Sequence, residues 1–205
     1  MYKNVNSRGI PKPKEVEPIK KMKDIEKIKQ YLRGKDNRRD YLMFVLGINV
    51  GLRAGDLLKL RISEVYSGSD VRETVRITEE KTKKVREFTL NRNASAAITY
   101  YLEGLSEINT DCYLFPSQKG GHLSVSSAHK IIKNLLRELH IKGNYGTHTL
   151  RKTFAYHIYV SQAGSNPMIL STLQKMLNHS SQLTTLRYIG ITKEVIEDIY
   201  NSINL

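Results

Sequence analysis

The feature of this sequence that most constrains its fold is a single change in hydrophobic period. Over most of the chain, apolar residues recur at the three- and four-residue spacing of helices, as Ile25, Ile28 and Leu32 do. Residues 71–90 instead alternate apolar and polar side chains, with the basic run KTKK at 81–84 in the middle. That alternation predicts a β-hairpin with a basic tip. We therefore expect an α+β chain that is predominantly helical, with one small antiparallel β-sheet.

Helical spacing returns on both sides of this hairpin. Gly51 is expected to end one helix and Thr147 to cap the start of another, since these residue types are common at those positions. Residues 113–115, YLF, are expected to form a short strand. The expected helices cover about residues 25–32, 41–48, 54–60, 94–105, 124–139, 147–159 and 167–177, and run from about 192 to the end.

The chain start differs in composition from the rest. Residues 1–20 contain three prolines, which interrupt any helix, so this segment is expected to be an extended basic arm or linker. Residues 21–205 are long enough to form one domain with its own core. The basic residues of the predicted arm are Lys3, Arg8, Lys12, Lys14 and Lys20.

Charge is the property of the composition that bears most on function. The 33 Lys and Arg residues exceed the 20 Asp and Glu residues, which gives a net charge of +13 and a pI of about 9.7. Such a field attracts polyanions, which favours nucleic acid first and an anionic membrane surface second. A basic protein with neither partner stays open on composition alone. The chain has no apolar run long enough for a membrane span, and its first residues lack the apolar stretch expected of a signal peptide.

The single cysteine bears on the compartment. Cys112 cannot form an internal disulfide, which suits a reducing cytoplasm. Its neighbours in the sequence CYLF are apolar, so we expect a buried thiol.

A histidine and an arginine in the segment THTLRKTFAYH, residues 147–157, suggest a phosphate site. His148 and Arg151 are three residues apart and therefore share one face of the expected helix. A guanidinium cannot bind a metal ion, but it offers a planar pair of donors to a phosphate, and an imidazole beside it can move a proton. Alone, the pair is weak evidence, because a capping histidine and a solvated arginine would look the same.

Two further segments are equally weak when taken singly. In LNHSSQLTTLRYIGI, residues 177–191, Tyr188 follows His179 by nine residues. In GLRAGDLLKL, residues 51–60, Arg53 lies at a helix start, where backbone N–H groups favour anions.

Taken in order, these segments resemble the three conserved boxes of the tyrosine recombinase, or phage integrase, family over residues 20–200. The hairpin is similar to the basic β-turn that carries the family's catalytic lysine. Asn178 departs from the glycine common in the family, with little expected effect because asparagine tolerates the left-handed conformation. The residues that the resemblance implies for catalysis are Arg53, Lys81, His148, Arg151, His179 and the nucleophile Tyr188. Those expected to contact DNA are Lys83 and Lys84, together with Arg8, Lys12 and Lys14 in the arm.

The resemblance implies a site-specific recombinase that integrates, excises or inverts DNA through a 3′-phosphotyrosine intermediate, without a metal or any other cofactor. Double-stranded DNA is the implied partner, with a tetrameric synapse of this chain on DNA, a monomer in its absence, and room for accessory DNA-bending proteins. The implied location is the cytoplasm, in association with the nucleoid. Two alternatives stay open: a DNA-binding module with the same fold but no catalysis, and a relaxase similar to type IB topoisomerases.

Two details of the resemblance concern the ends of the chain. The family's N-terminal DNA-clamping domain has no counterpart in the sequence. The chain is therefore either a shortened form or similar to the short fimbrial-switch recombinases. After Tyr188, Ile191, Val195 and Ile199 form an apolar stripe. That stripe is expected either to dock on a neighbouring subunit, as in the family, or to pack on its own domain.

Overall fold

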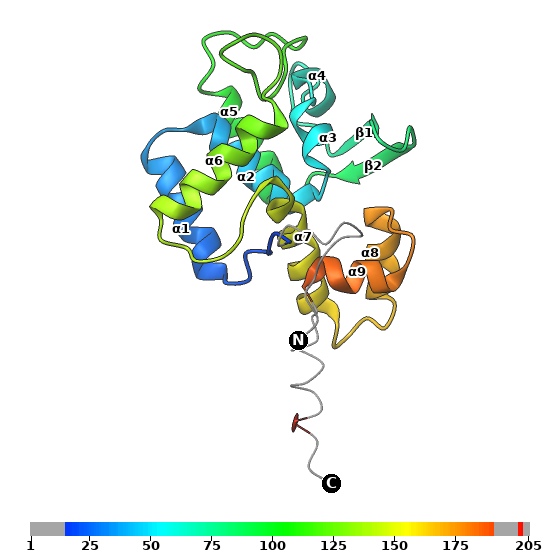
Figure 1. Cartoon of the computed structure of the whole chain (residues 1–205). Helices are drawn as coiled ribbons and strands as arrows, with labels where there is room; N and C mark the ends of the chain where they lie inside the picture. Colours follow the sequence, from blue (N-terminus) through cyan, green and yellow to red (C-terminus); the bar gives the residue numbers. More distant parts are fainter. Residues whose placement is uncertain (1–14, 191–200, 203–205) are drawn as a thin grey trace, which may run out of the picture.

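The structure, a computed structural model, describes residues 15–190, 201 and 202, and it is mostly helical with one small sheet (Figure 1). The predicted α+β class is confirmed. The helices are α1 (Met22–Gly34), α2 (Arg38–Val50), α3 (Ala54–Leu58), α4 (Ile62–Val65), α5 (Arg92–Leu102), α6 (Val125–Glu138), α7 (Thr147–Gln162), α8 (Ile169–Leu177) and α9 (Gln182–Ile189), and the strands are β1 (Thr74–Thr78) and β2 (Val85–Thr89).

The centre of the main core is α2. Its residues from Leu42 to Gly47 are all buried, so this helix is enclosed by neighbours on every side rather than along one stripe. It packs against α1, α5 and α7, and Ile28 of α1 and Ile98 of α5 are fully buried there. Burial of each such side chain stabilises the fold by about 1.5–3 kcal/mol.

The longest helix, α7, connects this core to a smaller one. Its first half lies so close to α2 that a methyl group added at Gly47 would come within 2.6 Å of Leu150 Cδ1. Its second half contributes Ala155 to a separate apolar cluster with α8 and α9, whose other buried members are Ile169, Leu173, Leu177 and Ile189. Helix α7 is therefore a single element that packs in both the main core and the smaller cluster.

The hairpin forms where the alternation predicts it. Strands β1 and β2 are antiparallel, with Thr74 opposite Thr89 and Thr78 opposite Val85. Val75 and Ile77 point into the core, and the next residue of the same parity, Glu79, is buried as well. The turn that follows Glu79 lies beside α3 and carries the KTKK run.

Several local predictions were wrong. Residues 113–115 form no regular strand, since Tyr113 makes only an isolated bridge to Arg61. Cys112 is exposed, because the apolar side chains that follow it in the sequence, Leu114 and Phe115, turn into the core without it. Helix α9, which the sequence analysis did not anticipate, begins where the Ser181 side chain accepts a hydrogen bond from the Thr184 N–H at 3.2 Å.

The ends of the chain bear on two other predictions. The part of the predicted arm from residue 15 onward is extended but lies against α7. Ile19 is buried, and its N–H donates to Thr153 Oγ1 at 2.9 Å. The predicted C-terminal stripe of Ile191, Val195 and Ile199 lies outside the described residues.

A substitution at Gly51 would test how tightly the junction between α2 and α3 is packed. This glycine ends α2 with a φ of +59°, and a methyl group at this position would lie 2.3 Å from Phe154 Cδ1 of α7. We predict that Gly51→Ala lowers the melting temperature by roughly 5 °C or more, because strain in the left-handed region and overpacking each cost about 1–3 kcal/mol. Gly34→Ala, which has no atom within 4 Å of the added methyl group, should leave it nearly unchanged. Equal melting temperatures for the two variants would contradict this account of the junction.

Candidate active site

Arg53 stands at the N-cap of α3, immediately after the turn that ends α2. Its backbone is extended (φ −65°, ψ 148°), which directs the chain into the short helix. The Arg53 Nη1 atom lies 2.7 Å from Glu79 Oε2, at the end of β1. The hairpin therefore supplies the carboxylate that holds this guanidinium in place.

Helix α7 carries the predicted His148 and Arg151 pair on its first turn. The predicted helix is confirmed, although Gly146 rather than Thr147 occupies the N-cap. Arg151 is only 3% exposed, and its Nη2 donates to the Leu177 carbonyl oxygen at 2.6 Å. Burial lowers the pKa of Arg151 to about 10, so the guanidinium stays cationic at neutral pH.

His148 lies on the open side of the same turn. Desolvation by surrounding protein atoms lowers the pKa of His148 below its usual 6.5, and the positive charges of Arg151 and Lys152 lower it further. The positive charges of Arg53 and Lys81 act in the same direction. The ring is therefore neutral at pH 7 and can accept a proton.

His179 follows α8 directly. Asn178 ends that helix in the left-handed conformation (φ 51°, ψ 48°), as expected for a residue type that tolerates it. The Nδ1 atom of His179 forms a 3.1 Å hydrogen bond with Thr185 Oγ1, and Thr185 is fully buried in α9. Burial lowers the pKa of His179 to about 4, with contributions from Arg151 and Arg53, so this ring is also neutral.

Tyr188 projects from α9 toward His179. The two ring centroids are 4.9 Å apart at an interplanar angle of 69°, and Lys152 Nζ lies 5.1 Å from the tyrosine centroid. Burial raises the pKa of Tyr188, while the positive charge of Arg151 opposes that rise. The phenol is therefore protonated in the DNA-free protein and next to a cation that favours its ionised form.

The structure thus brings Arg53, His148, Arg151, His179 and Tyr188 into one site. Three of their atoms, Arg53 Nη1, Arg151 Nη1 and Tyr188 Oη, are buried without a hydrogen bond of regular geometry among the described residues. Arg53 Nη1 has the Glu79 carboxylate beside it, and the Tyr188 hydroxyl lies close enough to the Arg151 guanidinium for that group to lower the pKa of the phenol. Buried polar atoms are almost always paired, so two guanidiniums with spare buried N–H donors beside a phenol indicate a site for an anion.

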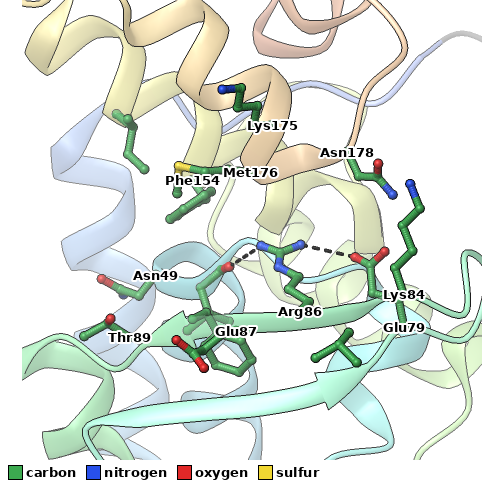
Figure 2. A pocket seen from close by; sticks show the side chains of 14 residues that line it. Asn49, Glu79, Lys84, Arg86, Glu87, Thr89, Phe154, Lys175, Met176 and Asn178 are labelled. Carbon is green, nitrogen blue, oxygen red and sulfur yellow. Dashed lines mark hydrogen bonds and ion pairs between the residues drawn. The ribbon is translucent and has the colours of Figure 1, made fainter.

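The candidate lysines lie at the rim. Lys81 is exposed on the turn after β1, and Lys83 and Lys84 are exposed on the same turn. Figure 2 shows Lys84 at the edge of an adjoining groove of about 640 Å³, with Lys175 and Asn178 across from it. The arm candidates Arg8, Lys12 and Lys14 lie outside the described residues.

The sequence analysis missed several residues that support this site. Glu79 is 2% exposed and binds Arg53, while Asp56 Oδ1 accepts the Glu80 N–H at 2.8 Å and Thr185 contacts His179. Arg86 is half-buried and donates to the Val50 carbonyl at 3.1 Å. The alternation of β1 gave a usable signal for Glu79, because it assigns this carboxylate to the buried face.

Neither a group of three or more histidine, cysteine or acidic side chains suited to a metal ion nor a helix long and apolar enough to cross a membrane is found in residues 15–190, 201 and 202.

Comparison with known proteins identifies the family. Residues 20–194 match the phage integrase family. The chain belongs to this family. It is 36% identical over 186 residues to the probable integrase/recombinase YoeC of Bacillus subtilis, covering 90% of this chain and 95% of that protein.

Solved structures share the fold of this phage integrase domain. The XerA recombinase superposes with a TM-score of 0.69 at 22% identity, covering 95% of this chain and 67% of that one. The XerH site-specific recombinase bound to its palindromic difH substrate gives a TM-score of 0.65 at 20% identity, covering 92% of this chain and 54% of that one. The predicted tyrosine recombinase catalytic fold is confirmed, and neither alternative class is favoured.

Substitution of the partly buried Arg53 and the buried Arg151 gives the first test of the site. We predict that Arg53→Ala and Arg151→Ala each slow DNA cleavage at least about 10²-fold, the usual cost of removing one donor from a developing oxyanion. Single-turnover assays on half-site DNA, taken from repeats flanking the encoding gene, would measure this. Arg76→Ala, which removes an exposed cation on β1, is the control and should cleave at the wild-type rate. If a folded Arg53 or Arg151 variant matched that control, the site would not use these arginines.

Proposed function

We propose that this chain cleaves and rejoins double-stranded DNA at specific sites, with Tyr188 as the nucleophile. The observation that carries the proposal is the placement of Arg151 Nη1 and the Tyr188 hydroxyl, two buried atoms without a hydrogen bond of regular geometry, next to each other and beside Arg53 and His179. A scissile phosphodiester supplies what both groups lack: anionic oxygens for the guanidinium and an electrophilic phosphorus for the phenol.

Charge neutralisation is the first requirement, because a phosphodiester anion resists a nucleophile. Arg53 and Arg151 bind the non-bridging oxygens, and His179 donates a further hydrogen bond as negative charge develops on them. The low pKa of His179 means that it acts as a neutral donor. No step requires a metal ion or a nucleotide cofactor.

Activation of the nucleophile is the second requirement. The proton of the Tyr188 hydroxyl passes to His148, which is neutral and able to accept it. The phenolate oxygen then attacks the phosphorus and forms the new bond of a 3′-phosphotyrosine. Arg151 favours the phenolate by proximity and so offsets the effect of burial on the pKa of Tyr188.

Departure of the 5′-oxygen is the third requirement. As its bond to phosphorus breaks, Lys81 gives this oxygen a proton, which yields a free 5′-hydroxyl. The phosphotyrosine preserves the bond energy, so a 5′-hydroxyl from another strand reverses the steps and restores the phosphodiester. Integration, excision and inversion are the outcomes that this exchange of strands provides.

Strand exchange between two sites requires four active sites, so we propose a tetrameric synapse on DNA and a monomer in its absence. Accessory DNA-bending proteins would assist the synapse, and the complex would lie in the cytoplasm with the nucleoid. We also propose that the chain divides into a basic arm, residues 1–20, and a catalytic domain, residues 21–205. Within that division, Lys83 and Lys84 contact the phosphate backbone, and Arg8, Lys12 and Lys14 extend the contact from the arm.

Loss of the Tyr188 hydroxyl is the most specific test of the reaction. We predict that Tyr188→Phe forms no covalent adduct with a nicked suicide substrate but binds DNA with nearly unchanged affinity, because only one oxygen is removed. Denaturing gels would detect the adduct and a binding isotherm the affinity. Tyr156→Phe, on α7, is the matched control and should form the adduct normally. A normal adduct yield from Tyr188→Phe would refute the assignment of the nucleophile.

The role of Lys81 is tested by the leaving group. A 5′-bridging phosphorothiolate needs no protonation, since a thiolate departs readily. We predict that Lys81→Ala cleaves ordinary DNA at least about 10²-fold more slowly, as expected for loss of a general acid, and cleaves the sulfur substrate at the wild-type rate. Selective rescue of Lys83→Ala instead would transfer the role two residues along the turn.

The arm is tested by salt dependence. Each phosphate that a cation neutralises contributes about −0.9 to the slope of log affinity against log salt. We predict that removal of residues 2–14, which leaves the packed segment from residue 15 intact, flattens this slope by several contacts. Cleavage of pre-bound DNA should be preserved. An unchanged slope would show that the arm does not touch DNA.

A further inference from the structure

The carboxylate of Glu79 links two parts of the site that the chemistry uses separately. One oxygen, Oε2, lies 2.7 Å from Arg53 Nη1 and also accepts the Thr82 hydroxyl at 2.7 Å. The other, Oε1, lies 3.5 Å from Arg86 Nη1, the contact drawn between Glu79 and Arg86 in Figure 2. The carboxylate therefore contacts α3, the turn and β2 at once.

The backbone of Glu79 closes the same turn. Its N–H donates to the Lys84 carbonyl and its carbonyl accepts the Lys83 N–H, both at 2.9 Å. Lys81 lies between Glu79 and Thr82, the two residues joined by the side-chain hydrogen bond. The position of the Lys81 backbone thus depends on how firmly Thr82 is held to the Glu79 carboxylate.

Burial makes this link costly to lose. Glu79 is 2% exposed, and a buried guanidinium or carboxylate deprived of its partner is strongly destabilising. Burial raises the pKa of Glu79, but the Thr82 hydrogen bond and the ion pair with Arg53 outweigh that effect and lower the pKa to about 2. The carboxylate therefore stays ionised at neutral pH, where its contacts with Arg53 and Arg86 keep their charge.

We propose that Glu79 is a positioning residue. Its one buried carboxylate fixes the turn that carries Lys81 relative to Arg53, and so aligns the proton donor with the guanidinium that binds the phosphate. The inference rests on the proposed function. It concerns how two groups are held, because Glu79 is surrounded by its own partners and does not face the reacting atoms.

Thr82→Val separates this role from simple stabilisation. The change removes the hydroxyl that holds the turn, together with its 3.4 Å contact from the Lys84 N–H, but leaves the Glu79–Arg53 ion pair, so the displacement should be confined to the turn that carries Lys81. A misplacement of about 1 Å costs on the order of 10²-fold in rate. We expect Thr82→Val to slow cleavage of ordinary nicked DNA at least about tenfold and to cleave the 5′-bridging phosphorothiolate at the wild-type rate. Thr78→Val, an exposed threonine at the end of β1, is the control and should match wild type on both substrates.

Glu79→Gln tests the other half of the link. This variant loses the charge that holds Arg53 as well as the bond to the turn. It should therefore be slower than wild type on both substrates, with the larger loss on ordinary DNA. Thermal unfolding of each variant checks that it is folded, and if Glu79→Gln does not fold, Thr82→Val decides alone.

The outcomes separate this inference from the proposed function. If wild-type protein forms no adduct on either substrate, the proposed function is wrong and the inference falls with it. If wild type forms the adduct but Thr82→Val matches it on ordinary DNA, or is slowed equally on both substrates, only the positioning role of Glu79 is wrong.

Discussion

The burial of the Arg151 guanidinium is the constraint on which the rest of the site depends. Leaving a buried ion without a partner costs on the order of several kcal/mol, so the fold must provide one. The Leu177 carbonyl, exposed by the end of α8, is that partner. This one contact ties the start of α7 to the end of α8, and it places His179, only two residues after Leu177, beside the same cation.

The ionisation states of the site follow from burial. In the DNA-free protein both histidines are neutral and Tyr188 is protonated, because each group is partly or largely removed from water. The two arginines stay charged. The site therefore holds positive charge, neutral proton carriers and an unreactive phenol, an arrangement that favours binding of a phosphate before the nucleophile ionises.

The sequence predicted the fold class and the hairpin because both depend on period alone. The alternation of Val75, Ile77 and Glu79 fixes the buried face of β1, and the spacing of apolar residues fixes the helices. It did not predict α9, since the polar run SSQ looks like a turn until Ser181 is seen to cap a helix. Cys112 was misplaced for a related reason: local apolarity does not determine which side chains turn inward.

The candidate site shows the same division. The order of the motifs predicted five residues that the structure places in one site. It also predicted Lys81, which lies at the rim of that site. The residues that hold them, Glu79, Asp56 and Thr185, act through contacts between segments far apart in the sequence, and no spacing rule connects Glu79 to Arg53. For Glu79 the alternation of β1 indicates burial, but it does not indicate which cation the carboxylate binds.

The most direct test of the account is the identity of the residue that becomes attached to DNA. Wild-type protein would be trapped on a nicked suicide substrate, digested with nuclease and protease, and the modified peptide sequenced by mass spectrometry. The account predicts a nucleotide phosphate on Tyr188 alone among the 12 tyrosines. A phosphate on another tyrosine or on a serine would contradict it, and so would the absence of any adduct from folded protein that binds and recombines its DNA site.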